Sequence, residues 1–169
     1  LEVVVDPGQA FGTGAHGTTR LCLELLPELD PPPGTPVTDL GCGSGVLAIA
    51  AAKLGLGPVL GVDHEVESVQ ATLDNARVNG VRVEARRFDL LRAGPAPGAP
   101  LVLANLLRPL LLAVCRAGFG GEQPRALIAS GLLVEQADEI AAAFAARHGL
   151  QEAARRDDGE WAALLLRRA

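Results

Sequence analysis

The segment DLGCGSG, residues 39–45, places three glycines at alternate positions between an apolar run and an alanine-rich stretch. Gly41, Gly43 and Gly45 allow the backbone to turn sharply from a strand into a helix and to approach a ligand closely, with the first helix amides pointing at it. Val46 stands where the last glycine of the G-x-G-x-x-G dinucleotide fingerprint would fall. The segment therefore predicts a ligand-binding βα turn of another kind, and a tight turn with accidental glycines is the alternative.

Short apolar runs alternate with segments of helical periodicity from residue 35 onward, which is typical of a mostly parallel sheet covered by helices on both faces. Strands are expected at 35–40, 58–63, 81–88, 101–106 and 124–130, and helices at 46–55, 66–79, 108–118 and 134–149. Residues 150–156 and 161–168 flank a DDGE turn and predict a terminal antiparallel hairpin. The Pro/Gly-rich residues 92–100 predict a loop, and the prolines at 31–33 separate a first helix from the first strand.

The expected helix at 66–79 carries apolar residues at three- and four-residue steps. These are Val66, Val69, Leu73 and Ala76. The spacing predicts that this face packs against the sheet.

Acidic residues end the second and third expected strands. Asp63 lies about 20 residues after Gly41, where a carboxylate can accept both hydroxyls of a ribose lying across the glycine loop. Asp89 follows Phe88, and the pair is placed to meet an adenine. The alternatives are a helix cap at Asp63 and a simple turn residue at Asp89.

The opening stretch GQAFGTGAHGTT, residues 8–19, has no apolar pattern that a strand or helix could use. It predicts a glycine-rich loop, and long loops of this kind are commonly functional, with a plain connection as the alternative.

Length and composition limit the remaining classes. The 169 residues, 49% of them hydrophobic, suit one globular domain, and the formal charge of −5 argues against direct nucleic-acid binding. No apolar run reaches the roughly 18 residues of a membrane span and no signal peptide is visible, so we expect no membrane association and a cytoplasmic location. The three scattered cysteines predict reduced thiols and no metal site. Because the chain begins without methionine, we expect a further segment upstream.

The glycine loop and the strand-end acids resemble S-adenosylmethionine-dependent methyltransferases of the seven-stranded class, whose cofactor loop reads D-x-G-x-G-x-G. Further segments are similar, in order, to the PrmA family, the bacterial enzymes that trimethylate ribosomal large-subunit protein eleven. They are DPGQAFGTGAHGTT, DLGCGSGVLAIAAAKLG, the acid of GVD, NARVNGV, ANLL, ASGLL-x-EQ and GEWAALLLRR.

The resemblance implies a Rossmann-like α/β methyltransferase domain over 1–169, with 1–34 as a cofactor-covering loop and helix and a substrate-recognition domain upstream. It implies S-adenosylmethionine as cofactor and the lysine and N-terminal amines of protein eleven as acceptors, in a monomeric enzyme. The cofactor-binding residues that it implies are Phe11, Thr18, Thr19, Gly41, Gly43, Gly45, Asp63, Asp89 and Asn105.

The resemblance also assigns the acceptor site to Asn105 and Leu106. Asn105 stands where amino-methylating enzymes carry an N-P-P-aromatic motif, and Leu106 and Leu107 replace the prolines, so carbonyl groups at Asn105 are expected to receive the amine. A strand-end cap is the alternative for Asn105. His16 is expected to order the covering loop or to touch the substrate, and Gly131 with Leu106 to leave room for added methyl groups.

Methyl transfer to an amine is an in-line displacement that mainly requires alignment, and no residue is assigned as general base. Three other functions stay open: a methyltransferase acting on RNA or a small molecule, a nicotinamide-dependent oxidoreductase, and a cofactor-binding module without catalysis.

Overall fold

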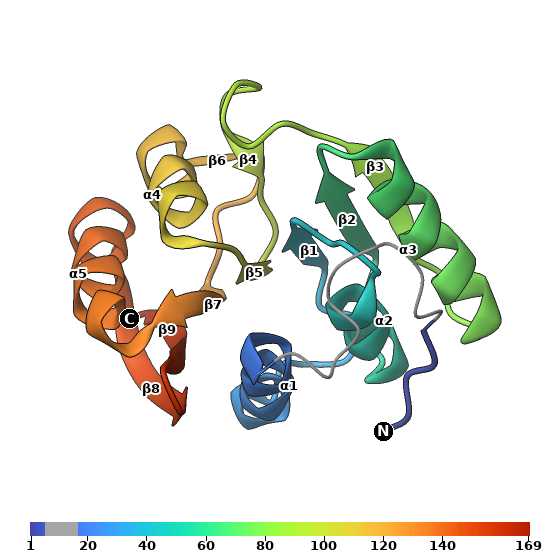
Figure 1. Ribbon diagram of the computed structural model, residues 1–169, viewed down its shortest axis with the longest axis horizontal. Helices are drawn as coiled ribbons and strands as arrows, with labels where there is room; N and C mark the ends of the chain where they lie inside the picture. Colours follow the sequence, from blue (N-terminus) through green and yellow to red (C-terminus); the bar gives the residue numbers. More distant parts are fainter. Residues whose placement is uncertain (6–16) are drawn as a thin grey trace.

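The computed structural model describes residues 1–5 and 17–169. Phe11 and His16, both expected in the covering loop, lie outside the described residues. A seven-stranded sheet with strand order β3-β2-β1-β5-β7-β9-β8 crosses the molecule (Figure 1). The strands are β1 (Val37–Leu40), β2 (Val59–Asp63), β3 (Glu84–Arg87), β5 (Leu101–Asn105), β7 (Ala126–Leu133), β8 (Leu150–Asp158) and β9 (Trp161–Arg168). The helices are α1 (Gly17–Leu29), α2 (Val46–Lys53), α3 (Val66–Val78), α4 (Arg108–Ala117) and α5 (Ala137–His148).

The five strands from β1 to β7 in this sheet pair in parallel, and the hairpin β8-β9 joins β7 in antiparallel orientation. The predicted fold, a mostly parallel sheet that ends in an antiparallel hairpin, is therefore confirmed. Helices cover both faces: α4 and α5 pack in one apolar core, whereas α1 and α2 pack in the other. No helix in the described part of the chain is both long and apolar enough to cross a bilayer.

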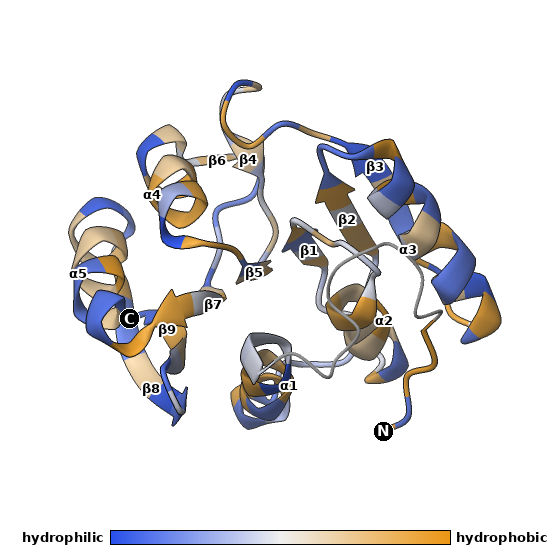
Figure 2. Cartoon of the chain, viewed as in Figure 1, coloured by the Kyte–Doolittle hydropathy of each residue, from blue (hydrophilic) through white to orange (hydrophobic). Residues whose placement is uncertain are grey.

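The middle of the sheet is buried and mostly apolar because helices cover both of its faces, whereas the edge strand β3 is charged. All four residues of β1 are buried, while the edge strand β3 reads EARR and is largely exposed. Figure 2 shows the same contrast between hydrophobic β2 and hydrophilic β3. Buried parallel strands need apolar side chains on both faces, and charges on an edge strand discourage pairing with another chain.

Several expected boundaries are wrong. The strand expected at 81–88 covers only β3, because the Val81 amide donates to the Ala76 carbonyl oxygen at the end of α3. The loop expected at 92–100 contains the short strand β4 (Ala96–Pro97), which pairs with β6 (Phe119–Gly120). The helix expected at 134–149 begins as a 3₁₀ turn, η1 (Val134–Gln136), and the strand expected at 124–130 extends through β7 to Leu133.

The apolar face expected on α3 is only partly confirmed, because Ala76 is buried whereas Val66, Val69 and Leu73 are not. Val66 is 55% exposed, and the buried residues of α3 are Ser68, Thr72, Asn75 and Ala76. This mostly polar face is buried because it hydrogen-bonds the backbone of the glycine loop. Polar side chains are buried where they have hydrogen-bond partners, and the spacing of apolar residues gives no information about such partners.

Helix α1 begins at Gly17, within the segment 8–19 that was expected to form a glycine-rich loop. Thr18 and Thr19 lie in the first turn of α1 and are buried, although the sequence placed them in a loop. Ion pairs of Arg20 with Asp158 and of Arg156 with Glu28 join α1 to the terminal hairpin. These contacts attach both ends of α1 to β8.

Candidate functional site

A pocket of about 690 Å³ lies at the carboxyl ends of β1, β2 and β5, where the strand order reverses direction. Ligands of open α/β sheets bind in this position, because the loops there diverge to opposite faces. Its lining includes the predicted site residues Thr19, Gly41, Gly43, Asp63, Asp89, Asn105 and Leu106. The structure thus brings most of the described candidates to one cavity.

The glycine loop between β1 and α2 is held against β2. The amides of Gly41 and Cys42 donate to the Val62 carbonyl oxygen at 2.8 and 2.9 Å. Gly41, Gly43 and Gly45 all have positive φ, a conformation that favours glycine. The loop therefore turns as the sequence predicted.

Gly45 has a different place from the other two loop glycines. It does not line the pocket, and a Cβ atom there would lie 3.0 Å from the Cα atom of Thr72. Its missing side chain lets α3 approach the loop. Gly41 instead faces Leu106, since an added Cβ would lie 2.5 Å from a methyl carbon of that residue.

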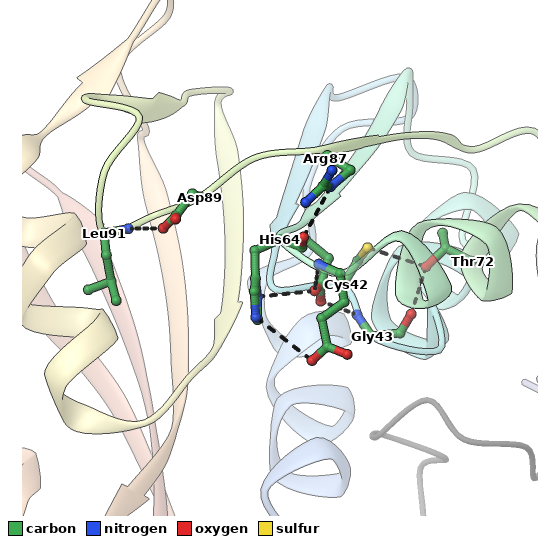
Figure 3. Close-up of polar contacts among 9 residues, drawn as sticks. Cys42, Gly43, His64, Thr72, Arg87, Asp89 and Leu91 are labelled. Carbon is green, nitrogen blue, oxygen red and sulfur yellow. Dashed lines mark hydrogen bonds and ion pairs between the residues drawn. The ribbon is translucent and has the colours of Figure 1, made fainter.

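Two residues of α3 that the sequence analysis did not single out hold the glycine loop. The Thr72 hydroxyl donates to the Gly43 carbonyl oxygen at 3.0 Å, and the Asn75 amide donates to the Ser44 carbonyl oxygen at 2.8 Å. Figure 3 shows Thr72 pointing from α3 toward Cys42 and Gly43. The only signal in the sequence was polar residues spaced three apart on one helix face.

Asp63 bonds to both the glycine loop and the start of α3. Its Oδ2 accepts from the Gly43 amide at 3.1 Å, and its Oδ1 accepts from the Glu65 amide at 3.0 Å. His64 Nδ1 lies 3.5 Å from the same carboxylate (Figure 3). Asp63 therefore bonds to the start of α3 and also lines the pocket. Its carboxylate keeps lone pairs that can accept hydrogen bonds from a ligand.

Asp89 is both a turn residue and a pocket residue. Its Oδ1 accepts from the Leu91 amide at 2.9 Å, as Figure 3 shows, and its backbone oxygen accepts from the amides of Arg92 and Ala93. Phe88 and Leu90 line the pocket beside it. This corner offers an apolar ring and one remaining carboxylate oxygen, which suits a flat heterocycle.

Asp39, the first residue of the glycine-loop motif, was missing from the predicted site. It lines the pocket at 1% exposure, and neither carboxylate oxygen has a hydrogen-bond partner among the described residues. Burial, with a smaller contribution from the charge of Asp63, raises the pKa of this carboxyl to about 8. The Ala48 amide acts in the opposite direction without reaching hydrogen-bond geometry. A buried carboxyl without a partner is costly, and a cationic ligand would supply one.

The side of the pocket formed by Asn105 and Leu106, called the acceptor side because the resemblance assigns the acceptor amine to it, joins α1 to β5. The Asn105 amide nitrogen donates to the Thr19 hydroxyl at 3.0 Å, and Leu106 lines the pocket next to it. Thr18 is buried beneath and does not line the pocket; its carbonyl oxygen accepts from the Ser130 hydroxyl at 2.9 Å. The side chain of Asn105 therefore points toward α1 rather than serving only as a strand cap.

The expectation that Gly131 leaves room for methyl groups does not fit its position. Gly131 does not line the pocket, because its open side faces the backbone of Leu106: an added Cβ would lie 2.7 Å from the Leu106 carbonyl carbon.

The cysteines are buried and form no disulfide, and burial raises the pKa of the Cys22 and Cys42 thiols to about 12. Neither thiol supplies a thiolate nucleophile near neutral pH.

The strand order and the glycine loop at its switch point define a Rossmann-like fold of the seven-stranded methyltransferase class. Residues 1–169 match the model of the family "Ribosomal protein L11 methyltransferase (PrmA)", and the chain belongs to this family.

Individual relatives agree with the family match. The chain is 49% identical over 150 residues to a ribosomal protein L11 methyltransferase of Bordetella parapertussis, covering 86% of this chain and 46% of that protein. It is 44% identical over 160 residues to one of Pseudomonas putida, covering 93% of this chain and 54% of that protein. The chain thus spans about half the length of the curated relatives it matches. The crystal structure of a ribosomal protein L11 methylase from Lactobacillus delbrueckii subsp. bulgaricus is 33% identical with a TM-score of 0.83, covering 98% of this chain and 84% of that one.

Proposed function

We propose that this chain is the catalytic domain of a protein methyltransferase that transfers methyl groups from S-adenosylmethionine to amino groups of ribosomal protein L11. The acceptors are lysine side chains and the N-terminal amine, and the products are trimethylated. The observation that carries the proposal is that the glycine loop, Asp63 and Asn105 line the same pocket. Family membership over residues 1–169 supports the same reaction.

The pocket fits S-adenosylmethionine on its own chemistry. Asp63 would accept from the ribose hydroxyls, and Phe88 with Asp89 would hold the adenine. The unpartnered carboxylate of Asp39 would receive the ammonium of the methionyl part. The bound cofactor supplies an electrophilic methyl group on a sulfonium sulfur.

At the acceptor side, the chain's own residues orient an amine. Because the Asn105 amide nitrogen donates to Thr19, the amide oxygen Oδ1 is left to accept from the incoming amine. Alignment of nucleophile, methyl carbon and leaving sulfur is the main requirement of this displacement. An apolar wall at Leu106 and Leu110 excludes water, which favours the neutral amine by desolvation and lowers its pKa from about 10.4. No residue is assigned as base.

The charge of the pocket favours an amine over a phosphate-bearing acceptor. Its described lining carries five acidic side chains and one arginine: Asp39, Asp63, Glu65, Glu67, Asp89 and Arg92. Of the acids, Asp39 contributes least charge at pH 7, because burial raises the pKa of its carboxyl to about 8. Such a wall attracts cations and repels the phosphates of RNA. We therefore place methylation of RNA and of small molecules second. We also propose that the enzyme is monomeric and acts in the cytoplasm.

Recognition of the protein substrate is proposed to depend on a part of the protein outside residues 1–169, since the chain spans about half the length of the curated relatives it matches. A linked binding domain raises the effective concentration of the acceptor at the pocket.

The proposal is tested by methyl transfer from radiolabelled S-adenosylmethionine to purified ribosomal protein L11, with ribosomal RNA as the competing acceptor. We expect label in the protein, mass increments of methyl groups on amines, and none in RNA. Asp74→Ala, an exposed acid on α3, serves as the unaffected control and Asp63→Ala as the disabled enzyme. Label in RNA alone would overturn the choice of acceptor, and absence of cofactor binding by calorimetry would overturn the reaction class.

A further inference from the structure

Six residues close a ring beneath the acceptor side of the pocket: Thr18, Thr19, Asn105, Leu106, Ser130 and Gly131. We propose that Ser130 and Gly131, which make no contact with the pocket themselves, are positioning residues that hold Asn105 and Leu106 in register with α1. This inference rests on the proposed function, because it assigns Asn105 to the acceptor amine.

The first link in the ring is the hydroxyl of Ser130. Ser130 is fully buried in β7, and its Oγ donates to the Thr18 carbonyl oxygen at 2.9 Å, with the Ala162 carbonyl oxygen farther away at 3.3 Å. A hydroxyl has one proton, so the shorter contact identifies Thr18 as the main acceptor. The bond attaches the first turn of α1 to the sheet directly beside Thr19.

The second link joins the backbones of β7 and of the segment after β5. Asn105 pairs with Ser130 in the parallel register, and the Leu106 amide donates to the Ser130 carbonyl oxygen at 3.0 Å. The β7-β9 register shifts across Ser130 and Gly131 themselves, between Ala129 and Leu132, where β7 has one residue more than β9, and this marks a bulge. Bulges re-aim neighbouring groups and are common beside functional sites.

Gly131 makes this close approach possible. Its φ is +85°, and an added Cβ would lie 2.7 Å from the Leu106 carbonyl carbon and 3.0 Å from the Leu106 nitrogen. Those neighbours are backbone atoms, so a side chain at position 131 would displace Leu106 itself. The glycine thus serves the path of the chain at Leu106 and not the volume of the pocket.

The Asn105–Thr19 bond closes the ring from the pocket side. Ser130 holds both the start of α1 and the segment after β5. The side-chain amide of Asn105 is therefore fixed relative to Thr19, and its oxygen keeps a fixed direction. Catalysis of group transfer is sensitive to such placement, since a misplacement of about 1 Å can cost about 100-fold in rate.

The test compares Ser130→Ala and Gly131→Ala with Gly121→Ala. Gly121 also has positive φ, +73°, but an added Cβ would meet nothing within 4 Å, so this control measures backbone strain alone. We expect kcat for ribosomal protein L11 to fall about tenfold in Ser130→Ala and about 100-fold in Gly131→Ala. The dissociation constant for S-adenosylmethionine should stay within about threefold, and Gly121→Ala should resemble the wild type.

A double-mutant cycle separates positioning from general stability. If Ser130 acts through Asn105, Ser130→Ala should cost little further kcat in the Asn105→Ala background. Independent, multiplicative losses would overturn the proposal, as would an unchanged kcat in a folded Ser130→Ala variant.

A readout without turnover uses the side-chain amides. The chain has three asparagines and five glutamines, so ¹⁵N spectra of the labelled protein contain eight side-chain NH₂ pairs, and Asn105→Ala identifies the pair of Asn105. We expect Ser130→Ala to shift the Asn105 pair and leave the other pairs in place; an unmoved Asn105 pair would contradict the ring. A wild type that binds cofactor but methylates no protein would instead overturn the proposed function.

Discussion

The two sides of the pocket are built in different ways. On the cofactor side, the contacts join residues near one another in the chain: Gly43 to Asp63 across 20 positions and Gly43 to Thr72 across 29. On the acceptor side, Asn105 contacts Thr19 across 86 positions and Ser130 contacts Thr18 across 112. The first side is a local βαβ unit, whereas the second exists only after the sheet and α1 have assembled. Changes on the cofactor side should therefore act on cofactor affinity, and changes on the acceptor side on turnover.

The largest expected effect is the loss of cofactor binding in Gly43→Val. Gly43 has φ +55° and lies between the Asp63 carboxylate and Thr72, so a branched side chain would both strain the loop and intrude where it meets the ligand. Calorimetry should detect no binding of S-adenosylmethionine. Gly34→Val is the matched control, because Gly34 also has positive φ and open space around it. Normal binding by Gly43→Val would mean that the loop does not face the cofactor.

Asn105→Ala should lower kcat by about 100-fold with only a small change in cofactor affinity, because it removes an interaction that orients the amine. Loss of the Asn105–Thr19 bond frees the start of α1 at the pocket. Steady-state kinetics and calorimetry on the same preparation give the two quantities, with Asn79→Ala as a control outside the pocket. Equal losses in both would move Asn105 to the cofactor side and remove the contrast between the two sides.

The contrast between local and long-range contacts also explains which parts of the site could be predicted from the sequence. The βα pattern, the glycine loop and the strand-end acids are local signals, and the structure places Gly41, Gly43, Asp63 and Asp89 in one pocket as expected. Residue types alone could not reveal that Thr18 is buried under the site or that Gly131 faces Leu106, because both depend on how β7 lies beside β5.

Buried polar residues are a second feature that hydrophobic periodicity could not predict. The apolar residues of α3 predicted its buried face, yet Thr72 and Asn75 face inward because the glycine loop offers them carbonyl oxygens. Asp39 was overlooked for a related reason, since a carboxylate in a buried strand has no periodic signature. Only its place at the head of the loop motif could have drawn attention to it.

Asp63→Ala should weaken cofactor binding by about 1.5–3 kcal/mol, the usual range for hydrogen bonds to a charged group. This variant also removes the acceptor for the Gly43 and Glu65 amides, so part of the loss comes from the loop. Asp63→Asn retains one oxygen acceptor and should lose less. Calorimetry of the folded variants measures both changes, and an affinity equal to that of the wild type in Asp63→Ala would remove Asp63 from the ribose site.

The smallest effect at neutral pH, and the most specific, is expected at Asp39. A carboxyl with a pKa of about 8 is mostly protonated at pH 7 in the free protein, and a cationic ligand favours its ionised form. Binding of S-adenosylmethionine should therefore release this proton, and affinity should rise by up to about tenfold per pH unit from pH 6 toward 8 and then level off. Asp39→Asn should lack this component, so its deficit relative to the wild type grows with pH.

The free protein should show the opposite trend in stability. Because the pKa of Asp39 in the folded state lies above its ordinary value, the folded state holds an extra proton, and its stability falls as pH rises from about 4 to about 8. Asp39→Asn should remove that fall and so be more stable than the wild type at pH 8 while binding the cofactor more weakly. The cofactor's own amino group titrates near pH 8, but it contributes equally to both proteins and cancels in their difference. Parallel pH profiles of affinity for the two proteins would show that Asp39 does not meet the cation, and the cofactor side would then rest on Asp63 and the glycine loop.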